Sequence, residues 1–121
     1  MRKLLSVILV GIGVLLSGCK EEVDSSKVYV FSQPGCGHCI NAHEYMARYY
    51  KNYDIKELNI REGSNMNHMI RYARKFKVAE QTLGTPFIVI GDNYIMGWGN
   101  EQVKEFNRLM KNLKPSTSKN K

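Results

Sequence analysis

The stretch that decides the fold is Ser32-Gln33-Pro34-Gly35-Cys36-Gly37-His38-Cys39-Ile40-Asn41-Ala42-His43. It places two cysteines three positions apart, with a glycine and a histidine between them and a second histidine four residues further on. Such a cluster can serve as a redox pair, as part of a metal site or as a structural disulfide. The choice depends on the local structure that carries the cysteines and on the compartment in which the protein works.

The residues around the cysteines predict a helix that begins directly after a buried strand. Residues 27–32, Lys-Val-Tyr-Val-Phe-Ser, are β-branched and aromatic with almost no polar interruption, as in a strand covered on both faces. Pro34-Gly35 then turns the chain. From Cys39 onward, apolar and aromatic side chains recur at helical spacing and share one face. These side chains are Ala42, Tyr45, Met46, Tyr49, Tyr50 and Tyr53.

The rest of the sequence predicts one more strand, two more helices and a hairpin. Residues 55–60 alternate apolar and polar side chains, as a strand does. Ser64 can cap the next helix and Asn100 the last one. Gly84-Thr85-Pro86 breaks the chain, and two apolar runs flank Gly91-Asp92-Asn93 as in a tight hairpin. The predicted order is β-α-β-α-β-β-α, an α/β domain.

The beginning of the chain has the composition of an export signal. Met1-Arg2-Lys3 precedes an uncharged apolar run that ends in small residues before Cys19, as in a secretory signal. The run is shorter than the ~18–20 residues that a spanning helix needs. Leu16-Ser17-Gly18-Cys19 resembles a bacterial lipobox, which implies cleavage before Cys19 and lipid on its sulfur. An uncleaved membrane anchor and an ordinary cleaved signal are alternatives, and both also export the domain.

The sequence therefore divides into four parts: a lipoprotein signal peptide (1–18), a lipidated tether (19–26), one folded domain (27–113) and a disordered tail (114–121). Without the signal, about a hundred residues remain, enough for one small core. We expect the protein in the bacterial cell envelope, held to the membrane by lipid and facing the periplasm or the cell exterior. Such surroundings are oxidising, so Cys36 and Cys39 can persist as a disulfide.

The basic residues do not point to a nucleic-acid partner. The net charge is +7, and the densest basic cluster contains Arg71, Arg74, Lys75 and Lys77. We interpret this cluster as the solvated face of a helix. An exported lipoprotein has little use for a nucleic-acid surface, so we expect none.

The position of the two cysteines favours thiol chemistry. A cysteine attacks as thiolate, and the first turn of a helix lowers its pKa through unpaired backbone N–H groups and the positive end of the dipole. Cys36, at the entrance, is the predicted nucleophile, and Cys39, one turn further in, is the predicted resolving thiol. A protonated His38 stabilises the Cys36 thiolate, and this makes the disulfide a stronger oxidant.

These features together resemble the thioredoxin superfamily over about residues 27–113. The strand, the Cys-x-x-Cys pair, the helix and a distant Thr-Pro before a strand carry the resemblance. Cys36-Gly37-His38-Cys39 is the tetrapeptide characteristic of protein disulfide isomerases. Residues 32–36 are similar to the approach in glutaredoxins, and Gly84-Thr85-Pro86 resembles bacterial periplasmic disulfide isomerases.

The resemblance implies a thioredoxin-like fold with a central mixed sheet flanked by helices. It also implies a thiol-disulfide oxidoreductase that acts on protein thiols and disulfides and needs no cofactor. Pro86 would be cis and lie against the Cys36–Cys39 pair, and the Thr85 backbone would pair with an extended substrate peptide. A redox partner in the membrane is compatible with the lipid anchor.

The sequence departs from the patterns of these families in three places. Gly35 stands where thioredoxins carry tryptophan. Val28-Tyr29-Val30-Phe31 contains no acidic residue, whereas thioredoxins bury one there as a proton acceptor, so proton transfer at Cys39 needs water or another group. Residues 96–100, Met-Gly-Trp-Gly-Asn, replace the Gly-Gly-x-Asp-type stretch with which glutaredoxins bind glutathione.

A metal site is the main alternative to redox work. Cys36, Cys39 and His43, with His38 as a fourth ligand, could bind copper or zinc. The chain has no second Cys-x-x-Cys and the intervening histidine has a redox explanation, so we expect no metal. A c-type haem would need a histidine directly after Cys39, where Ile40 stands. A purely structural disulfide is disfavoured because so short a loop removes little chain entropy.

Overall fold

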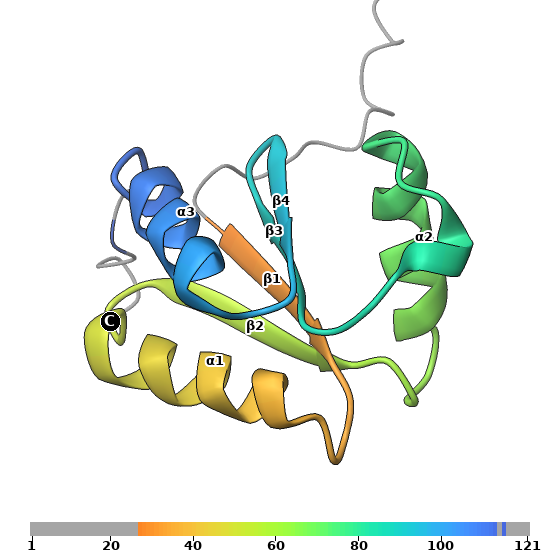
Figure 1. Ribbon diagram of the computed structural model, residues 1–121, viewed down its shortest axis with the longest axis horizontal. Coiled ribbons are helices and arrows are strands. Elements are labelled where there is room, and N and C mark those ends of the chain that lie inside the picture. The colour runs from red at the N-terminus through yellow and green to blue at the C-terminus, as the bar shows by residue number, and fades with distance from the viewer. Residues whose placement is uncertain (1–26, 114, 116–121) are drawn as a thin grey trace, which may run out of the picture.

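The computed structural model describes residues 27–113 and Pro115 as one sheet with helices on both faces (Figure 1). The predicted signal peptide, tether, lipidation site at Cys19 and nearly all of the tail lie outside these residues. Within them, no helix is long and apolar enough to cross a membrane. The predicted order of strands and helices is found, with one additional short 3₁₀ helix.

The elements are β1 (Lys27–Ser32), α1 (Gly37–Tyr49), β2 (Asp54–Asn59), α2 (Asn65–Lys75), η2 (Glu80–Thr82), β3 (Phe87–Ile90), β4 (Asn93–Met96) and α3 (Asn100–Met110). The sheet order is β2-β1-β3-β4. β1 is parallel to β2, which requires the crossover that α1 supplies, and antiparallel to β3. β3 and β4 form the predicted hairpin, and Gly91 provides the positive φ of 58° in its turn.

The two faces of the sheet carry separate cores, because successive strand side chains point to opposite faces. α1 and α3 cover one face and α2 covers the other, as Figure 1 shows. On the first face Val28 and Val30 of β1 pack with Phe106 of α3. On the second face Phe31 packs with Met69 of α2. Residues of β1 are therefore buried on both faces, as its composition predicted.

α1 ends earlier than the aromatic spacing suggested. The helix stops at Tyr49, whose side chain is 60% exposed, so Tyr49 does not belong to the buried face. Tyr50 leaves the helical conformation (φ −131°, ψ 34°) and packs edge-on against Phe106, with ring centroids 5.2 Å apart. Tyr53 follows in the turn and packs against Tyr50. The helix therefore ends before the periodic pattern of aromatic residues does, at the point where Tyr50 packs against α3.

Two predicted helix caps also differ in detail. α3 begins at Asn100, so its N-cap is Gly99 rather than Asn100. Ser64 does occupy the N-cap position of α2, but its side chain makes no capping hydrogen bond. Both helices are held instead by the apolar faces that they bury against the sheet.

We predict that Phe106→Ala destabilises the domain by about 3–5 kcal/mol, because it removes a fully buried ring. Urea unfolding followed by circular dichroism measures the change. Met66→Ala is the control, because Met66 is 40% exposed and its loss leaves no comparable cavity. Equal effects of the two substitutions would contradict this assignment of the core.

Candidate active site

The sheet register brings two distant segments together at the site. Phe31 of β1 pairs with Phe87 of β3 in an antiparallel ladder. The loop that carries Cys36 follows β1, and Thr85 and Pro86 precede β3, so both segments lie at the same edge of the sheet. β1 is central in the sheet, parallel to β2 on one side and antiparallel to β3 on the other.

Cys36 is the N-cap of α1. Its backbone is extended (φ −91°, ψ 108°), and its sulfur accepts a hydrogen bond from the Cys39 backbone N–H at 3.2 Å. An N-cap acceptor satisfies one of the unpaired N–H groups at a helix start, and negative charge there is favoured by the helix dipole. The first turn of α1 contains no acidic residue that would compete for this position. The helix start is therefore arranged to hold a thiolate.

Thr85 reaches the same sulfur from the other segment. Its hydroxyl donates a hydrogen bond to Cys36 Sγ at 3.4 Å. The thiol form of Cys36 can in turn donate to the Thr85 carbonyl oxygen, 3.6 Å away. The two protonation states of Cys36 thus have different partners on Thr85, the hydroxyl for the thiolate and the carbonyl for the thiol.

Gln33 completes this arrangement, and the sequence analysis did not single it out. Its side-chain amide donates to the Thr85 hydroxyl oxygen at 3.1 Å. The only sequence signal was its position beside the motif, since a partner 52 residues away cannot be read from local spacing. A hydrogen-bonded series therefore runs from Gln33 through Thr85 to Cys36.

The two cysteines have opposite pKa shifts. Partial burial opposes ionisation of Cys36, but hydrogen bonds from the Cys39 side chain, the Thr85 side chain and the backbone of Cys39 and His38 outweigh it, so the pKa of Cys36 is lowered. Burial raises the pKa of Cys39, and its hydrogen bond to the Cys36 side chain raises it further. Both cysteines are free thiols, and Cys39 is only 7% exposed. These shifts favour Cys36 as the first of the two thiols to ionise, with Cys39 as a hydrogen-bond donor to it.

The Thr85–Pro86 peptide bond is cis, as the resemblance implied. Pro86 is fully buried, and its carbonyl oxygen accepts a hydrogen bond from the Gly97 backbone N–H at 2.8 Å. The segment facing Cys36 is thus anchored to the sheet through Pro86. The expected pairing of the Thr85 backbone with a substrate peptide stays a prediction.

His38 contributes to the site through its main chain. Its backbone N–H is one of the groups that lower the pKa of Cys36. Its side chain is exposed. The predicted electrostatic action of the imidazole on the thiolate stays a prediction.

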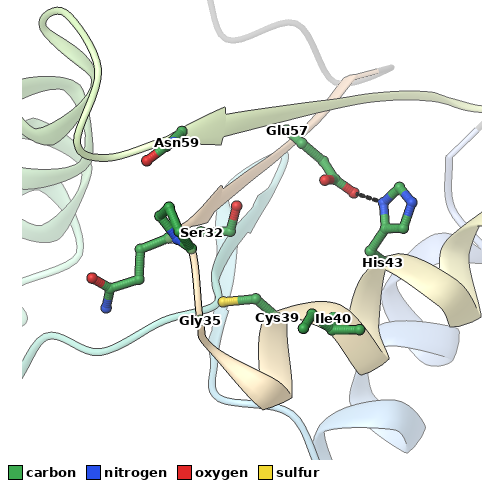
Figure 2. Close-up of a pocket in the computed structure, with 9 residues that line it drawn as sticks. Ser32, Gly35, Cys39, Ile40, His43, Glu57 and Asn59 are labelled. Carbon is green, nitrogen blue, oxygen red and sulfur yellow. Dashed lines mark hydrogen bonds and ion pairs between the residues drawn. The ribbon is translucent and has the colours of Figure 1, made fainter.

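A hollow of about 350 Å³ lies on the β2 side of the cysteines and is lined by Ser32, Cys39, His43, Glu57 and Asn59, among others. Figure 2 shows Glu57 extending from β2 toward His43 on α1. His43 Nδ1 and Glu57 Oε2 are 2.5 Å apart, and this contact raises the pKa of His43. The sequence analysis had considered His43 only as a metal ligand, and Glu57 not at all.

The ligands of the alternative metal site do not come together. Among residues 27–113, no group of three or more His, Cys, Asp or Glu side chains is arranged to hold a metal ion. His43 pairs with Glu57, and the Cys36 sulfur faces Thr85 and the Cys39 backbone N–H. The geometry therefore does not support the metal site that the cysteine and histidine spacing left open.

Solved structures share this fold. A glutaredoxin from Archaeoglobus fulgidus matches with a TM-score of 0.52 and 22% identity, over 75% of this chain and 99% of that chain. A glutaredoxin from Methanosarcina mazei Go1 matches with a TM-score of 0.52 and 18% identity, over 72% of this chain and 82% of that chain. A mutant of the thioredoxin-like protein BC3987 matches with a TM-score of 0.50 and 18% identity, over 68% and 95% of the two chains.

No protein-family model and no curated protein matches the sequence. The similarity to the solved structures concerns architecture, because fewer than a quarter of the aligned residues are identical. The mixed sheet, the helices on both faces and these neighbours establish a thioredoxin-like α/β fold, as the sequence predicted.

We predict that a limiting amount of iodoacetamide modifies Cys36 about tenfold faster than Cys39 near neutral pH, because Cys36 is the less buried of the two and is also the one favoured as thiolate. Peptide mass spectrometry of the reduced protein measures the two rates. The denatured chain is the control, since unfolding removes both the hydrogen bonds and the burial. Faster modification of Cys39 in the folded protein would refute the assigned order of ionisation.

A second prediction concerns Glu57→Gln, which should lower the pKa of His43 toward its ordinary value of about 6.5. Because Glu57 raises the pKa in the folded state, its stabilising effect is full below about pH 6.5 and is lost as pH rises through the folded-state value. The effect on the unfolding free energy is small, since His43 is 60% exposed. Histidine signals in nuclear magnetic resonance spectra report the titration, with Glu62→Gln as control. An unchanged His43 titration in Glu57→Gln would exclude the pairing in solution.

Proposed function

We propose that this protein is a thiol-disulfide oxidoreductase that acts on disulfides and thiols of other proteins. The observation that carries the proposal is the unequal cysteine pair: Cys36 caps a helix and receives hydrogen bonds that favour its thiolate, while Cys39 is buried and holds its proton. A nucleophile and a resolving thiol need these two properties. The structural neighbours, glutaredoxins among them, add support at the level of fold.

The chemistry in the reducing direction has two exchange steps. The Cys36 thiolate attacks one sulfur of a substrate disulfide, forms a mixed disulfide and releases the other substrate sulfur as thiolate. Cys39 then loses its proton and attacks Cys36 Sγ, which releases the second substrate thiolate and leaves a Cys36–Cys39 disulfide. Two electrons pass from the cysteine pair to the substrate. In the oxidising direction the same steps run in reverse, beginning with a substrate thiolate that attacks the Cys36–Cys39 disulfide.

Thr85 and Pro86 are the proposed substrate-binding residues. Thr85 faces Cys36 through its hydroxyl and its carbonyl oxygen, and the buried Pro86 anchors the backbone beside it to the sheet. An extended substrate strand can pair with a backbone edge held in this way. His38, exposed beside Cys36, is proposed to tune the redox potential when protonated.

We also propose that the domain works outside the cytoplasm, attached through lipid on Cys19 to a bacterial membrane. The support is the sequence of residues 1–19, with its basic start, apolar run and lipobox-like end. Proteins that fold in the same oxidising surroundings would be the substrates. A membrane redox partner would restore the cysteine pair after each turnover.

The proposal predicts that Cys39→Ala accumulates mixed disulfides, because attack by Cys36 proceeds but resolution cannot. Incubation with a protein that contains an accessible disulfide, followed by non-reducing electrophoresis and mass spectrometry, detects the adduct and its site. Cys36→Ala is the matched control and should give none. A folded Cys39→Ala variant that forms no adduct through Cys36 would overturn the proposed function.

A further inference from the structure

Three groups form a directed hydrogen-bond series beside the nucleophile. The Gln33 side-chain amide donates to Thr85 Oγ1 at 3.1 Å, and the Thr85 hydroxyl donates to Cys36 Sγ at 3.4 Å. Gln33 lies in the loop between β1 and α1 and is partly buried, as is Thr85. The series therefore links the loop before the motif to the segment before β3 through the reactive sulfur.

The chemistry of the Thr85 hydroxyl explains why the Gln33 amide matters. A hydroxyl group has one proton to donate and can also accept hydrogen bonds. If Thr85 Oγ1 accepted a proton from the Cys36 thiol, the contact would favour the neutral sulfur; if it donates, the contact favours the thiolate. An amide N–H that points at the oxygen takes one of its two acceptor positions, so the hydroxyl proton is directed away from that amide, toward the sulfur.

We propose that Gln33 is a positioning residue for the thiol chemistry, and that its side-chain amide fixes the Thr85 hydroxyl as a hydrogen-bond donor to the Cys36 sulfur. Its consequence for disulfide exchange rests on the proposed function, but its action on Cys36 does not. The titratable groups beside Cys36 are Cys39 and His38, both on α1, whereas Gln33 and Thr85 carry no charge.

The same arrangement can serve the second exchange step. When Cys39 attacks Cys36, the two sulfurs approach to about 2.05 Å, so a hydroxyl held near one sulfur comes close to the other. Burial raises the pKa of Cys39, whereas the Gln33 backbone N–H and the Thr85 side chain act to lower it. Gln33 and Thr85 therefore favour negative charge first on Cys36 and then on Cys39.

The sign of the redox effect follows from which state is stabilised. A hydrogen bond to the Cys36 thiolate stabilises the reduced protein, and stabilising the reduced form makes the disulfide a stronger oxidant. Removing the Gln33 amide should therefore raise the pKa of Cys36 and make the disulfide harder to reduce.

The test compares Gln33→Met, Gln33→Glu and Thr85→Val in the reduced full domain without substrate, and reads the ionisation of Cys36 from the pH dependence of its alkylation. We expect Gln33→Met to lower the acid dissociation constant of Cys36 about three- to tenfold, the value of one hydrogen bond. Gln33→Glu should lower it further, because a carboxylate accepts the Thr85 hydroxyl proton and adds negative charge. Gln81→Met, at an exposed glutamine, should leave it unchanged.

The Thr85→Val background decides whether Gln33 acts through the hydroxyl. Once the hydroxyl is gone, Gln33→Met should have no further effect on the Cys36 ionisation, which a double-mutant cycle measures. An equal effect in both backgrounds, or no effect of Gln33→Met in the wild-type background, would overturn the proposal. In the unsubstituted protein, the Gln33 side-chain amide signals should shift with the ionisation of Cys36, and their failure to do so would also refute it.

Failure of this inference is distinguishable from failure of the proposed function. The Cys36 ionisation is measured on the protein alone, whereas the proposed function depends on mixed disulfides with a substrate. A Cys36 ionisation that responds to Gln33 supports the inference even in a protein that forms no mixed disulfide. If mixed disulfides form but the ionisation of Cys36 does not respond to substitution of Gln33, the inference fails and the proposed function stands.

Discussion

The hydrogen bond between the Cys39 backbone N–H and Cys36 Sγ is the contact on which the site depends. The sulfur is at once the cap of α1 and the atom that the proposed function uses as nucleophile. A charged acceptor makes a stronger cap than a neutral thiol, so ionisation of Cys36 and stability of the helix start favour each other. Any substitution that loosens the first turn of α1 will therefore also make the thiolate less stable.

The sheet register keeps the groups around this sulfur in place. Phe31 and Phe87 are fully buried and paired, so the loop after β1 and the segment before β3 both extend from rigid positions. The loop itself depends on Gly35, whose φ of 79° lies in the left-handed region. A tryptophan there, as in thioredoxins, would adopt this conformation only with strain, and the departure from that pattern therefore has a backbone cause.

Local patterns predicted most of the fold and the position of the two cysteines at the start of a helix, and they failed where packing between distant residues decides. The buried β1, the turn before Cys36 and the hairpin at Gly91 each follow from a few neighbouring residues. The exposure of Tyr49 does not follow from its neighbours, because it depends on the packing of the Tyr50 ring against Phe106 of α3. Partners far apart in sequence, Gln33 with Thr85 and His43 with Glu57, depend on the sheet register, which composition and periodicity alone do not specify.

The register also places a carboxylate of β2, rather than one of β1, at the hollow beside Cys39. On the face that packs against α1, β1 presents Val28 and Val30, and the residue opposite Val30 on β2 is Glu57. Glu57 is partly exposed and lines the same hollow as Cys39. The volume of this hollow, about 350 Å³, accommodates several water molecules, each of which occupies about 30 Å³ in the liquid.

The lack of a carboxylate in β1 beside Cys39 has an energetic consequence. A carboxylate buried beside Cys39 would cost several kcal/mol in lost hydration. Val30 of β1 avoids this cost and packs in the core. The burial that raises the pKa of Cys39 is opposed by hydrogen bonds from the Gln33 backbone and the Thr85 side chain. The residues that stabilise charge on the sulfurs are therefore neutral donors, and they act on both cysteines from a single position between β1 and β3.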